Sequence, residues 1–220
     1  GLVIFGLIGA RLLFVAYNWE SYSNDPTTIV SEIMNGGLSF FGMIVFTGIY
    51  VWLYCRRFKF NYYEFLDFLM PAVLLGQIIG RWGNFFNYES YGPPTSVFWK
   101  MFVPETANFY FDLNARYFHP TFLYEIIPNC LLFVFIMLNY QKWTEKKSGV
   151  VFAVYAMGYG FIRMVVELFR VDSLKWQLPE QYHTNLGSFQ LTYILVSQVL
   201  AFLLILVGVY VYFTRKKVLY

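Results

Sequence analysis

Long apolar runs alternate with shorter polar stretches along the 220 residues of the chain. A helix that spans a membrane needs about 20 mostly apolar residues, with a range of about 17 to 25. Six segments meet or approach this length, so the pattern predicts an all-α polytopic membrane protein with six transmembrane helices. The segments are 1–17, 38–55, 65–80, 122–140, 150–170 and 189–213.

Basic residues are distributed unevenly among the loops between these segments. One set of alternate loops, with the C-terminal tail, holds nine of them: Arg56, Arg57, Lys59, Lys142, Lys146, Lys147, Arg215, Lys216 and Lys217. The other set holds only Lys100, Arg116 and Lys175. Loops rich in Lys and Arg stay on the cytoplasmic side, so the pattern predicts a cytoplasmic C-terminus and places Gly1 at the inner face. We expect one further upstream span, which makes seven in the full protein.

The connection 83–118 is much longer than the others. It has 36 residues, whereas most connections need about 4 to 6. It contains three prolines and many aromatic residues, which argue against a disordered link. We therefore predict a small extracytoplasmic cap, inserted within a single membrane-embedded domain that covers residues 1–220.

The composition excludes several classes of protein. Charged residues make up 13% of the chain, against about 25% in soluble domains, and the mean hydropathy is +0.50. A soluble enzyme of this size is therefore excluded, and a net charge of +3 is too small to indicate nucleic-acid binding. Cys55 and Cys130 lie in apolar runs without a CxxC spacing, so we expect no metal site and no cofactor.

Four arginines lie in or at the ends of the apolar segments: Arg11, Arg81, Arg163 and Arg170. An arginine in mid-bilayer costs about 2.5 to 3.5 kcal/mol, so a buried one indicates a functional site by default. Arg163 has a partner in Glu167, four residues later on the same helix face. This pair is either a structural ion pair between helices or part of an anion-binding site.

Polar residues are dense around Arg81. Asn84, Asn87 and Glu89 follow it where the helix meets the outer interface. With the arginine and glutamate of the later helix, they predict a polar pocket in the outer half of the bundle. The planar guanidinium matches phosphate oxygens well, so two arginines there indicate a phospholipid headgroup as ligand. An enzyme and an anionic-lipid transporter both fit this pocket, and the residues alone indicate no reaction.

The segment 80–92, GRWGNFFNYESYG, resembles the signature G-R-x-G-N-F-x-N-x-E-x-x-G of the bacterial prolipoprotein diacylglyceryl transferase family at every fixed position. The resemblance extends from about residue 9 to residue 217. Four further blocks agree in order: Gly36-Gly37-Leu38-Ser39-Phe40; Asp67-Phe68 with Pro71; His119-Pro120 with Leu123-Tyr124-Glu125; and Gly158-Tyr159-Gly160 with Arg163, Glu167 and Arg170.

The resemblance implies a reaction. The family transfers the diacylglyceryl group of phosphatidylglycerol to the lipobox cysteine thiol of a preprolipoprotein, forming a thioether and releasing glycerol phosphate. It therefore implies a transferase of the bacterial plasma membrane that acts in lipoprotein biosynthesis, with phosphatidylglycerol and lipobox signal peptides as partners. A non-catalytic relative that binds these partners remains open, as does a lipid transporter, which predicts broken helices in both halves of the chain.

The resemblance also implies roles for individual residues. Arg81 and Arg163 would clamp the phosphate and stabilise the growing charge of the leaving group. Glu89 and Glu167 would orient these arginines, and Gly92 would meet a backbone requirement at the edge of the cap. The implied catalytic residues are Arg81, Arg163 and Glu167. The implied lipid-binding residues are Arg81, Asn84, Asn87, Glu89, Gly92, Arg163 and Arg170.

The source of a base is open. Many family members have His or Tyr after the Gly-Gly-Leu-Ser-Phe block, where this chain has Phe41, which accepts no proton. Thiolate formation then relies on the positive field of the arginines, on His119 as proton acceptor, or on a tyrosine; His119 also fits a structural role at a helix start. Family members typically have a further N-terminal span with site residues, and we expect weak activity without it.

Overall fold

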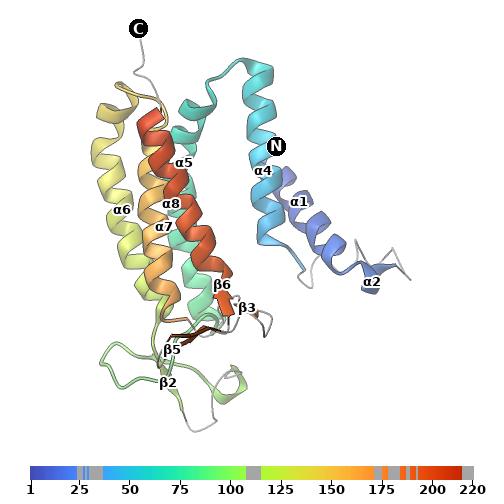
Figure 1. The fold of residues 1–220 in the computed structure, drawn as a ribbon, viewed down its shortest axis with the longest axis vertical. Helices are drawn as coiled ribbons and strands as arrows, with labels where there is room; N and C mark the ends of the chain where they lie inside the picture. The colour runs from blue at the N-terminus through green and yellow to red at the C-terminus, as the bar shows by residue number, and fades with distance from the viewer. Residues whose placement is uncertain are drawn as a thin grey trace. The chain divides into compact units, whose positions relative to one another are not determined.

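The computed structural model describes residues 1–23, 27, 29, 37–107, 115–170, 175–177, 184–186, 189–191 and 193–214. The chain forms two compact units, Gly1–Phe65 and Leu66–Tyr220, and each is described by itself. Helices dominate both units, as the ribbon in Figure 1 shows.

The first unit is a packed pair of helices. Helix α1 (Leu2–Tyr17) leads into the short α2 (Trp19–Tyr22), and α4 (Phe40–Phe58) packs against α1. The Ser39 hydroxyl caps the start of α4 by accepting the Gly42 N–H at 3.3 Å. Helix α4 ends at Lys59, whose φ of 59° turns the chain towards the next helix.

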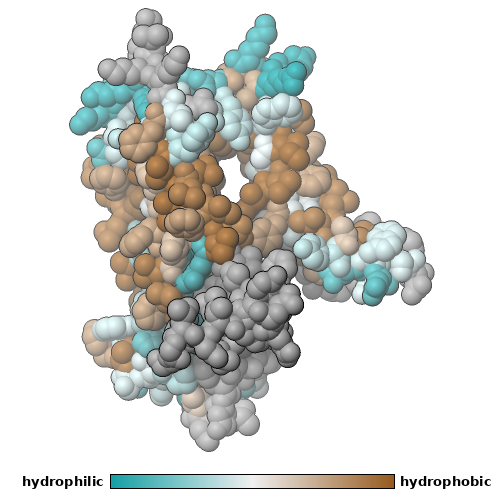
Figure 2. Space-filling model, in the orientation of Figure 1, coloured by the Kyte–Doolittle hydropathy of each residue, from teal (hydrophilic) through white to brown (hydrophobic). Residues whose placement is uncertain are grey.

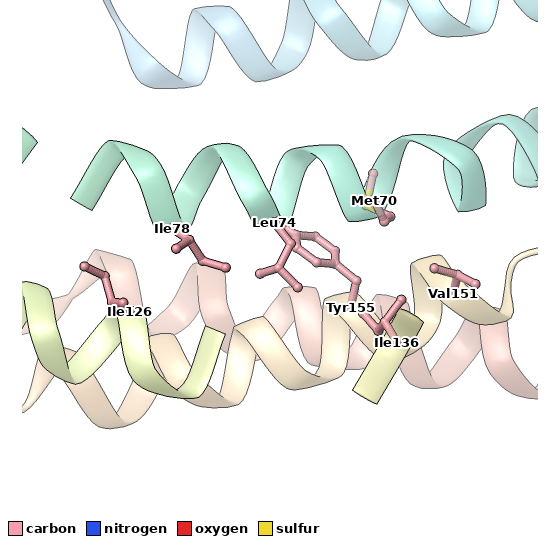
Figure 3. Close-up of a cluster of buried hydrophobic side chains, with 7 residues drawn as sticks. All are labelled: Met70, Leu74, Ile78, Ile126, Ile136, Val151 and Tyr155. Atoms are coloured by element: carbon pink, nitrogen blue, oxygen red, sulfur yellow. The ribbon is translucent and has the colours of Figure 1, made fainter. Parts of the chain in front are cut away.

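The second unit contains four helices. Helix α5 (Tyr62–Phe86) enters it from the first unit, and α6 (Thr121–Thr144), α7 (Val150–Glu167) and α8 (Val196–Thr214) follow. Helix α7 packs against both α6 and α8, which explains why it has so many buried residues. Helices α5, α6 and α7 share one apolar core (Figure 3), formed by Met70, Leu74, Ile78, Ile126, Ile136, Val151 and Tyr155.

The outer surface of the helices is apolar. Figure 2 shows hydrophobic residues over the middle of the helices and hydrophilic residues near their ends. Leu138 of α6 is 81% exposed and Phe161 of α7 is 64% exposed. In water such surfaces would drive association, whereas a lipid bilayer covers them without cost.

Residues between α5 and α6 form a small folded segment. Strand β1 (Met101–Phe102) pairs antiparallel with β2 (Tyr117–Phe118), and the 3-10 helix η2 (Glu105–Ala107) lies between them in the chain. This segment has its own core, formed by Tyr91, Met101, Val103 and Phe118. Two further antiparallel pairs precede α8: β3 (Lys175–Gln177) with β6 (Tyr193–Leu195), and β4 (Thr184–Leu186) with β5 (Phe189–Leu191).

The structure confirms the all-α membrane class. Helices overlap all six predicted segments, but four of the described helices are long and apolar enough to cross a membrane, so the number six is not confirmed. Those four are Tyr62–Phe86, Thr121–Thr144, Val150–Glu167 and Ser197–Thr214. The single domain and the cap boundaries stay predictions, although α5 continues to Phe86, beyond the predicted start of the cap at residue 83.

The predicted start of the last span was wrong. The apolar run begins at Phe189, but the helix begins at Val196, and the residues before it form β5 and β6. Those residues are rich in aromatic and branched side chains, which fit the pleated surface of a strand. A short apolar run of this kind does not distinguish a strand from a helix by its period.

Candidate functional site

Four charged side chains from three helices meet inside the second unit. Arg81 of α5 contacts Glu125 of α6, with a distance of 2.7 Å from Arg81 Nη2 to Glu125 Oε1. Arg163 of α7 contacts the other oxygen of Glu125 at 3.2 Å. Arg163 Nη2 also lies 2.9 Å from Glu167 Oε2, an ion pair whose angles fall short of a hydrogen bond. One carboxylate therefore joins both arginines.

Burial differs between the two kinds of charge in this cluster. The side chains of Glu125 and Glu167 are 2% and 1% exposed, whereas those of Arg81 and Arg163 are 21% and 18% exposed. The formal charges of the four groups cancel, which reduces the penalty of placing them in an apolar bundle. The arginines are therefore the more accessible members of the cluster.

The spacing within α7 brings Arg163 and Glu167 onto one face, as the sequence predicted. Residues four apart in a helix are neighbours on its surface. The Ser197 hydroxyl of α8 donates a hydrogen bond to Glu167, so this carboxylate also joins α7 to α8. The Tyr159 hydroxyl, one turn before Arg163, contacts Glu125 at 3.4 Å.

Glu125 was missing from the predicted site, although the sequence contained a signal for it. It is the one charged residue in the predicted span 122–140. The rule that indicated Arg163, that an ionisable group in a span has a function, applies equally to this glutamate. Glu125 belongs to one of the blocks that match the family, but the resemblance alone implied no role for it in the site.

The end of α5 carries the other polar residues of the signature. Arg81 Nη1 donates to the side-chain oxygen of Asn84 at 3.2 Å, and Asn84 Nδ2 reaches Glu89 at 3.5 Å. Glu89 is therefore linked to Arg81 through Asn84, and its predicted role in orienting an arginine stays a prediction. Asn87 is exposed, and its backbone N–H ends the helix by donating to Gly83 at 2.9 Å.

Gly92 lies where the segment after α5 crosses the start of α6. Its N–H donates to the His119 carbonyl at 2.9 Å. A Cβ atom at Gly92 would lie 2.6 Å from the Phe169 carbonyl oxygen and 2.8 Å from the His119 Cβ, closer than real contacts allow. The position therefore requires glycine, because two segments of backbone approach it.

Arg170 and Thr121 tie the end of α7 and the start of α6 to the same loop. Arg170 Nη2 donates to the Ser90 hydroxyl at 3.0 Å, and the Thr121 hydroxyl donates to the Ser90 carbonyl. Ser90 has a φ of 54°, an unusual backbone conformation that these contacts support. Arg170 is thus held beside the signature loop, three residues after Glu167.

His119 belongs to a separate group, directly after strand β2. Its Nδ1 atom lies 2.8 Å from the Tyr124 hydroxyl, which also accepts the indole N–H of Trp99 at 2.8 Å. Two tautomers fit this contact: Tyr124 donates to Nδ1, or Nδ1–H donates to Tyr124. Only the second tautomer leaves Nε2 able to accept a proton.

Arg11 is not part of the charged cluster. It lies in the first unit, where its Nε donates to the Ile29 carbonyl at 2.9 Å and its Nη1 to the Gly37 carbonyl at 3.0 Å. Its guanidinium also lies over the Phe14 and Tyr22 rings. Arg11 therefore holds the chain before α4.

Phe41 lies in the first turn of α4, and the hypotheses about a base remain predictions.

The chain is similar to known proteins over most of its length. Residues 1–214 match the family model described as prolipoprotein diacylglyceryl transferase. A relative from Synechococcus sp. (strain CC9902), named phosphatidylglycerol–prolipoprotein diacylglyceryl transferase, is 40% identical over 178 residues. Relatives with the same name from Parasynechococcus marenigrum (strain WH8102) and Acaryochloris marina (strain MBIC 11017) are 40% and 38% identical. Each match covers 79% of this chain and 63% of the relative, so the chain spans about 63% of their length.

Proposed function

Because the chain belongs to the prolipoprotein diacylglyceryl transferase family, we propose that it catalyses the first step of lipoprotein maturation. It transfers the diacylglyceryl group of phosphatidylglycerol to the thiol of a lipobox cysteine in a preprolipoprotein. The sulfur–carbon bond forms as the carbon–oxygen bond to the phosphate breaks. The phosphate oxygen keeps the electron pair, glycerol phosphate leaves, and the thiol proton passes to a base or to water.

The observation that carries this proposal is the bridge Arg81–Glu125–Arg163. One buried carboxylate binds both guanidinium groups, so the two arginines are close enough to act on one phosphate. A guanidinium has five N–H donors, and the contacts to the carboxylates use only part of them. Donors already in place stabilise a leaving phosphate without reorganisation as its charge increases.

The neighbouring polar residues support the same assignment. Asn84 contacts both Arg81 and Glu89, so it holds the arginine and is close enough to the site to bind a headgroup oxygen. Arg170, after the end of α7, donates a hydrogen bond to Ser90 of the loop that contains Gly92, and it adds positive charge at the edge of this loop. Asn87 is exposed at the end of α5, where a hydroxylated headgroup would approach.

The thiol proton has two routes in this proposal. Glu125 and Glu167 are already occupied by contacts to the arginines, so the proposal assigns the proton to neither of them. The usual thiol pKa is about 8.5, so the substrate thiol is mostly protonated at neutral pH. The positive field of the arginines favours its thiolate form. His119 is the other proton acceptor, through Nε2, in the tautomer in which Nδ1–H donates to Tyr124.

A transporter is less well supported. Transporters that bind substrates at mid-membrane typically use pairs of discontinuous helices. In the described part of the chain, α5 and α6 continue without interruption through Pro71 and Pro128. The alternative that the chain is a non-catalytic relative is tested by the lipidation assay with a lipobox peptide.

We also propose a location and an orientation for this bacterial membrane protein. The charged cluster lies near the end of α5, the start of α6 and the end of α7, whereas Lys142 lies in the last turn of α6. Since basic loops stay inside, the cluster faces the outer half of the plasma membrane and the C-terminus is cytoplasmic. A membrane-impermeant thiol reagent should leave a cysteine placed at Lys217 unlabelled in intact cells and label it after lysis.

The direct test incubates the purified chain with phosphatidylglycerol and a lipobox peptide, and then measures the peptide mass. We expect the mass to increase by one diacylglyceryl group. A peptide with serine at the lipobox position and a reaction with phosphatidylethanolamine are the controls. If a folded chain binds phosphatidylglycerol and leaves the peptide unchanged, the non-catalytic reading replaces the transferase.

A further inference from the structure

The first turn of α7 is capped by a side chain from another helix. Helix α7 begins after Gly149, which has no side chain and a φ of 87°. The first N–H groups of a helix have no acceptor within it, and the residue before the helix usually supplies one. Here Asp67 of α5 supplies two acceptors at the start of α7. Its Oδ2 accepts the Gly149 N–H at 2.6 Å, and its Oδ1 accepts the Phe152 N–H at 2.8 Å.

Asp67 is well fixed in this position. It is 1% exposed, and it is the one charged residue within the predicted span 65–80. A buried carboxylate needs strong hydrogen bonds, and two N–H groups at the positive end of a helix provide them. The contact therefore fixes both the position and the direction of the α7 terminus against α5.

The same two helices meet again at the charged cluster, at a matching distance. Asp67 precedes Arg81 by 14 residues on α5, and Gly149 precedes Arg163 by 14 residues on α7. With a rise of about 1.5 Å per residue, both separations are about 21 Å. The two helices run in the same direction (Figure 1), so the Asp67 contact at one end and the link through Glu125 of α6 at the other are in axial register.

The contacts between these two ends are mainly apolar. Leu74, Ile78 and Tyr155 belong to the shared core, and apolar contacts have no direction (Figure 3). A hydrogen bond of 2.8 Å from Gln77 to the Tyr155 hydroxyl adds a directional contact in this middle part. The two hydrogen bonds of Asp67 and the Gln77–Tyr155 bond are therefore directional contacts that oppose a slide of α7 along α5.

We propose that Asp67 is a positioning residue for the reaction. It sets the axial position of α7, and through this helix it places Arg163 and Glu167 against Arg81 and Glu125. Asp67 touches neither substrate nor leaving group. This inference rests on the proposed function for its kinetic test, and a distance measurement tests it independently of activity.

The kinetic test compares Asp67→Asn and Asp67→Glu with the unchanged chain. Asparagine loses one of the two acceptors, whereas glutamate keeps both and moves them by about 1.5 Å, one carbon–carbon bond. We expect both variants to fold, to retain phosphatidylglycerol and to have a kcat at least about 10-fold lower, because small misplacements reduce rates strongly. A purely stabilising cap would leave the kcat of the folded Asp67→Glu chain unchanged.

A double-mutant cycle with Arg163→Lys identifies the route of the effect. If Asp67 acts through Arg163, the two kcat losses are not additive, and Arg163→Lys has a smaller effect in the Asp67→Asn chain. Additive losses would overturn the proposal. The matched control is Asn61→Ala, which removes an exposed cap at the start of α5 and should leave kcat unchanged.

The distance test needs no activity. Spin labels at two exposed positions, Ile79 of α5 and Phe161 of α7, report the axial position of the two helices after Cys55 and Cys130 are replaced by alanine. We expect Asp67→Asn to shift or broaden the distance distribution by about 1.5 Å, one residue of helix rise. An unchanged distribution would overturn the positioning role, even if the chain transferred no lipid.

Discussion

Arg81 and Arg163 bind the two oxygens of the same buried carboxylate, at 2.7 Å and 3.2 Å. These arginines lie on different helices and far apart in the chain, and Glu125 of a third helix holds them together. The arrangement concentrates two planar N–H donors at one place. This relationship makes Glu125 as important for the proposed site as the two arginines that it binds.

Replacing Glu125 should separate the arginines. In Glu125→Gln, one carboxylate oxygen becomes an amide that presents N–H groups to a guanidinium, so one arginine loses its partner. Removing one partner of a buried ion pair typically costs about 3–5 kcal/mol. We expect the transfer rate of the folded fraction to decrease by about 100-fold, as seen when a transition-state donor is removed. The measurement is peptide lipidation by mass spectrometry.

The matched control for this prediction is Glu105→Gln. Glu105 and Arg116 form an ion pair of the same 2.7 Å length, but their side chains are 52% and 60% exposed. Exposed pairs contribute little, so activity and stability should stay unchanged. Equal activity of the two glutamine variants would show that Glu125 has no role beyond an ordinary surface pair.

Arg163→Lys should retain little transfer activity. Lysine keeps the charge, but it lacks the planar fork that contacts Glu125 and Glu167 at the same time. We expect the transfer rate to fall by about 10-fold or more, while the chain still inserts and extracts normally. Arg116→Lys, at the exposed pair, is the comparison. Full activity of Arg163→Lys would mean that charge alone matters at this position.

Gly92→Ala should destabilise the folded segment between α5 and α6. The added methyl group would lie 2.6 Å from the Phe169 carbonyl and 2.8 Å from the His119 Cβ, so two segments must move apart. We expect a lower thermal transition and a loss of transfer activity. Gly76→Ala on α5 is the control, because a Cβ there meets nothing within 4 Å and alanine favours a helix. If both variants have the same thermal transition as the unchanged chain, the close contacts at Gly92 do not limit its stability.

A pH profile separates the two roles of His119. If His119 accepts the thiol proton, His119→Ala loses activity at neutral pH and recovers as the pH approaches the usual thiol pKa of about 8.5, because the substrate then ionises by itself. The ratio of the variant rate to the unchanged rate should rise with pH. A ratio that stays constant from pH 7 to 9 would assign His119 to the packing around Tyr124 and Phe169.

The helices could be predicted well from the sequence, because each consists of one continuous apolar run and needs no information from other segments. The pair Arg163–Glu167 was predicted for the same reason: residues four apart in a helix always meet. The start of α8 was missed because the apolar run 189–195 fits a strand as well as a helix.

The contacts between helices could not be predicted in this way. Glu125 meets Arg81 and Arg163 only after three helices have packed, and the sequence contains no period that indicates this meeting. Asp67 was noted as part of a matching block, but its bonds to Gly149 and Phe152 depend on the axial position of α7. Arg11 was grouped with the other arginines of the spans, although it binds carbonyl groups of the first unit.

The charge balance of the cluster affects how the proposed enzyme would release its product. Two unpaired arginines in an apolar bundle would hold a dianionic leaving group tightly and slow each cycle. Glu125 and Glu167 neutralise the formal charge of both arginines and stay beside them throughout the cycle. In the proposed reaction this neutralisation would weaken the hold on glycerol phosphate, so the product would leave more easily before the next lipid binds.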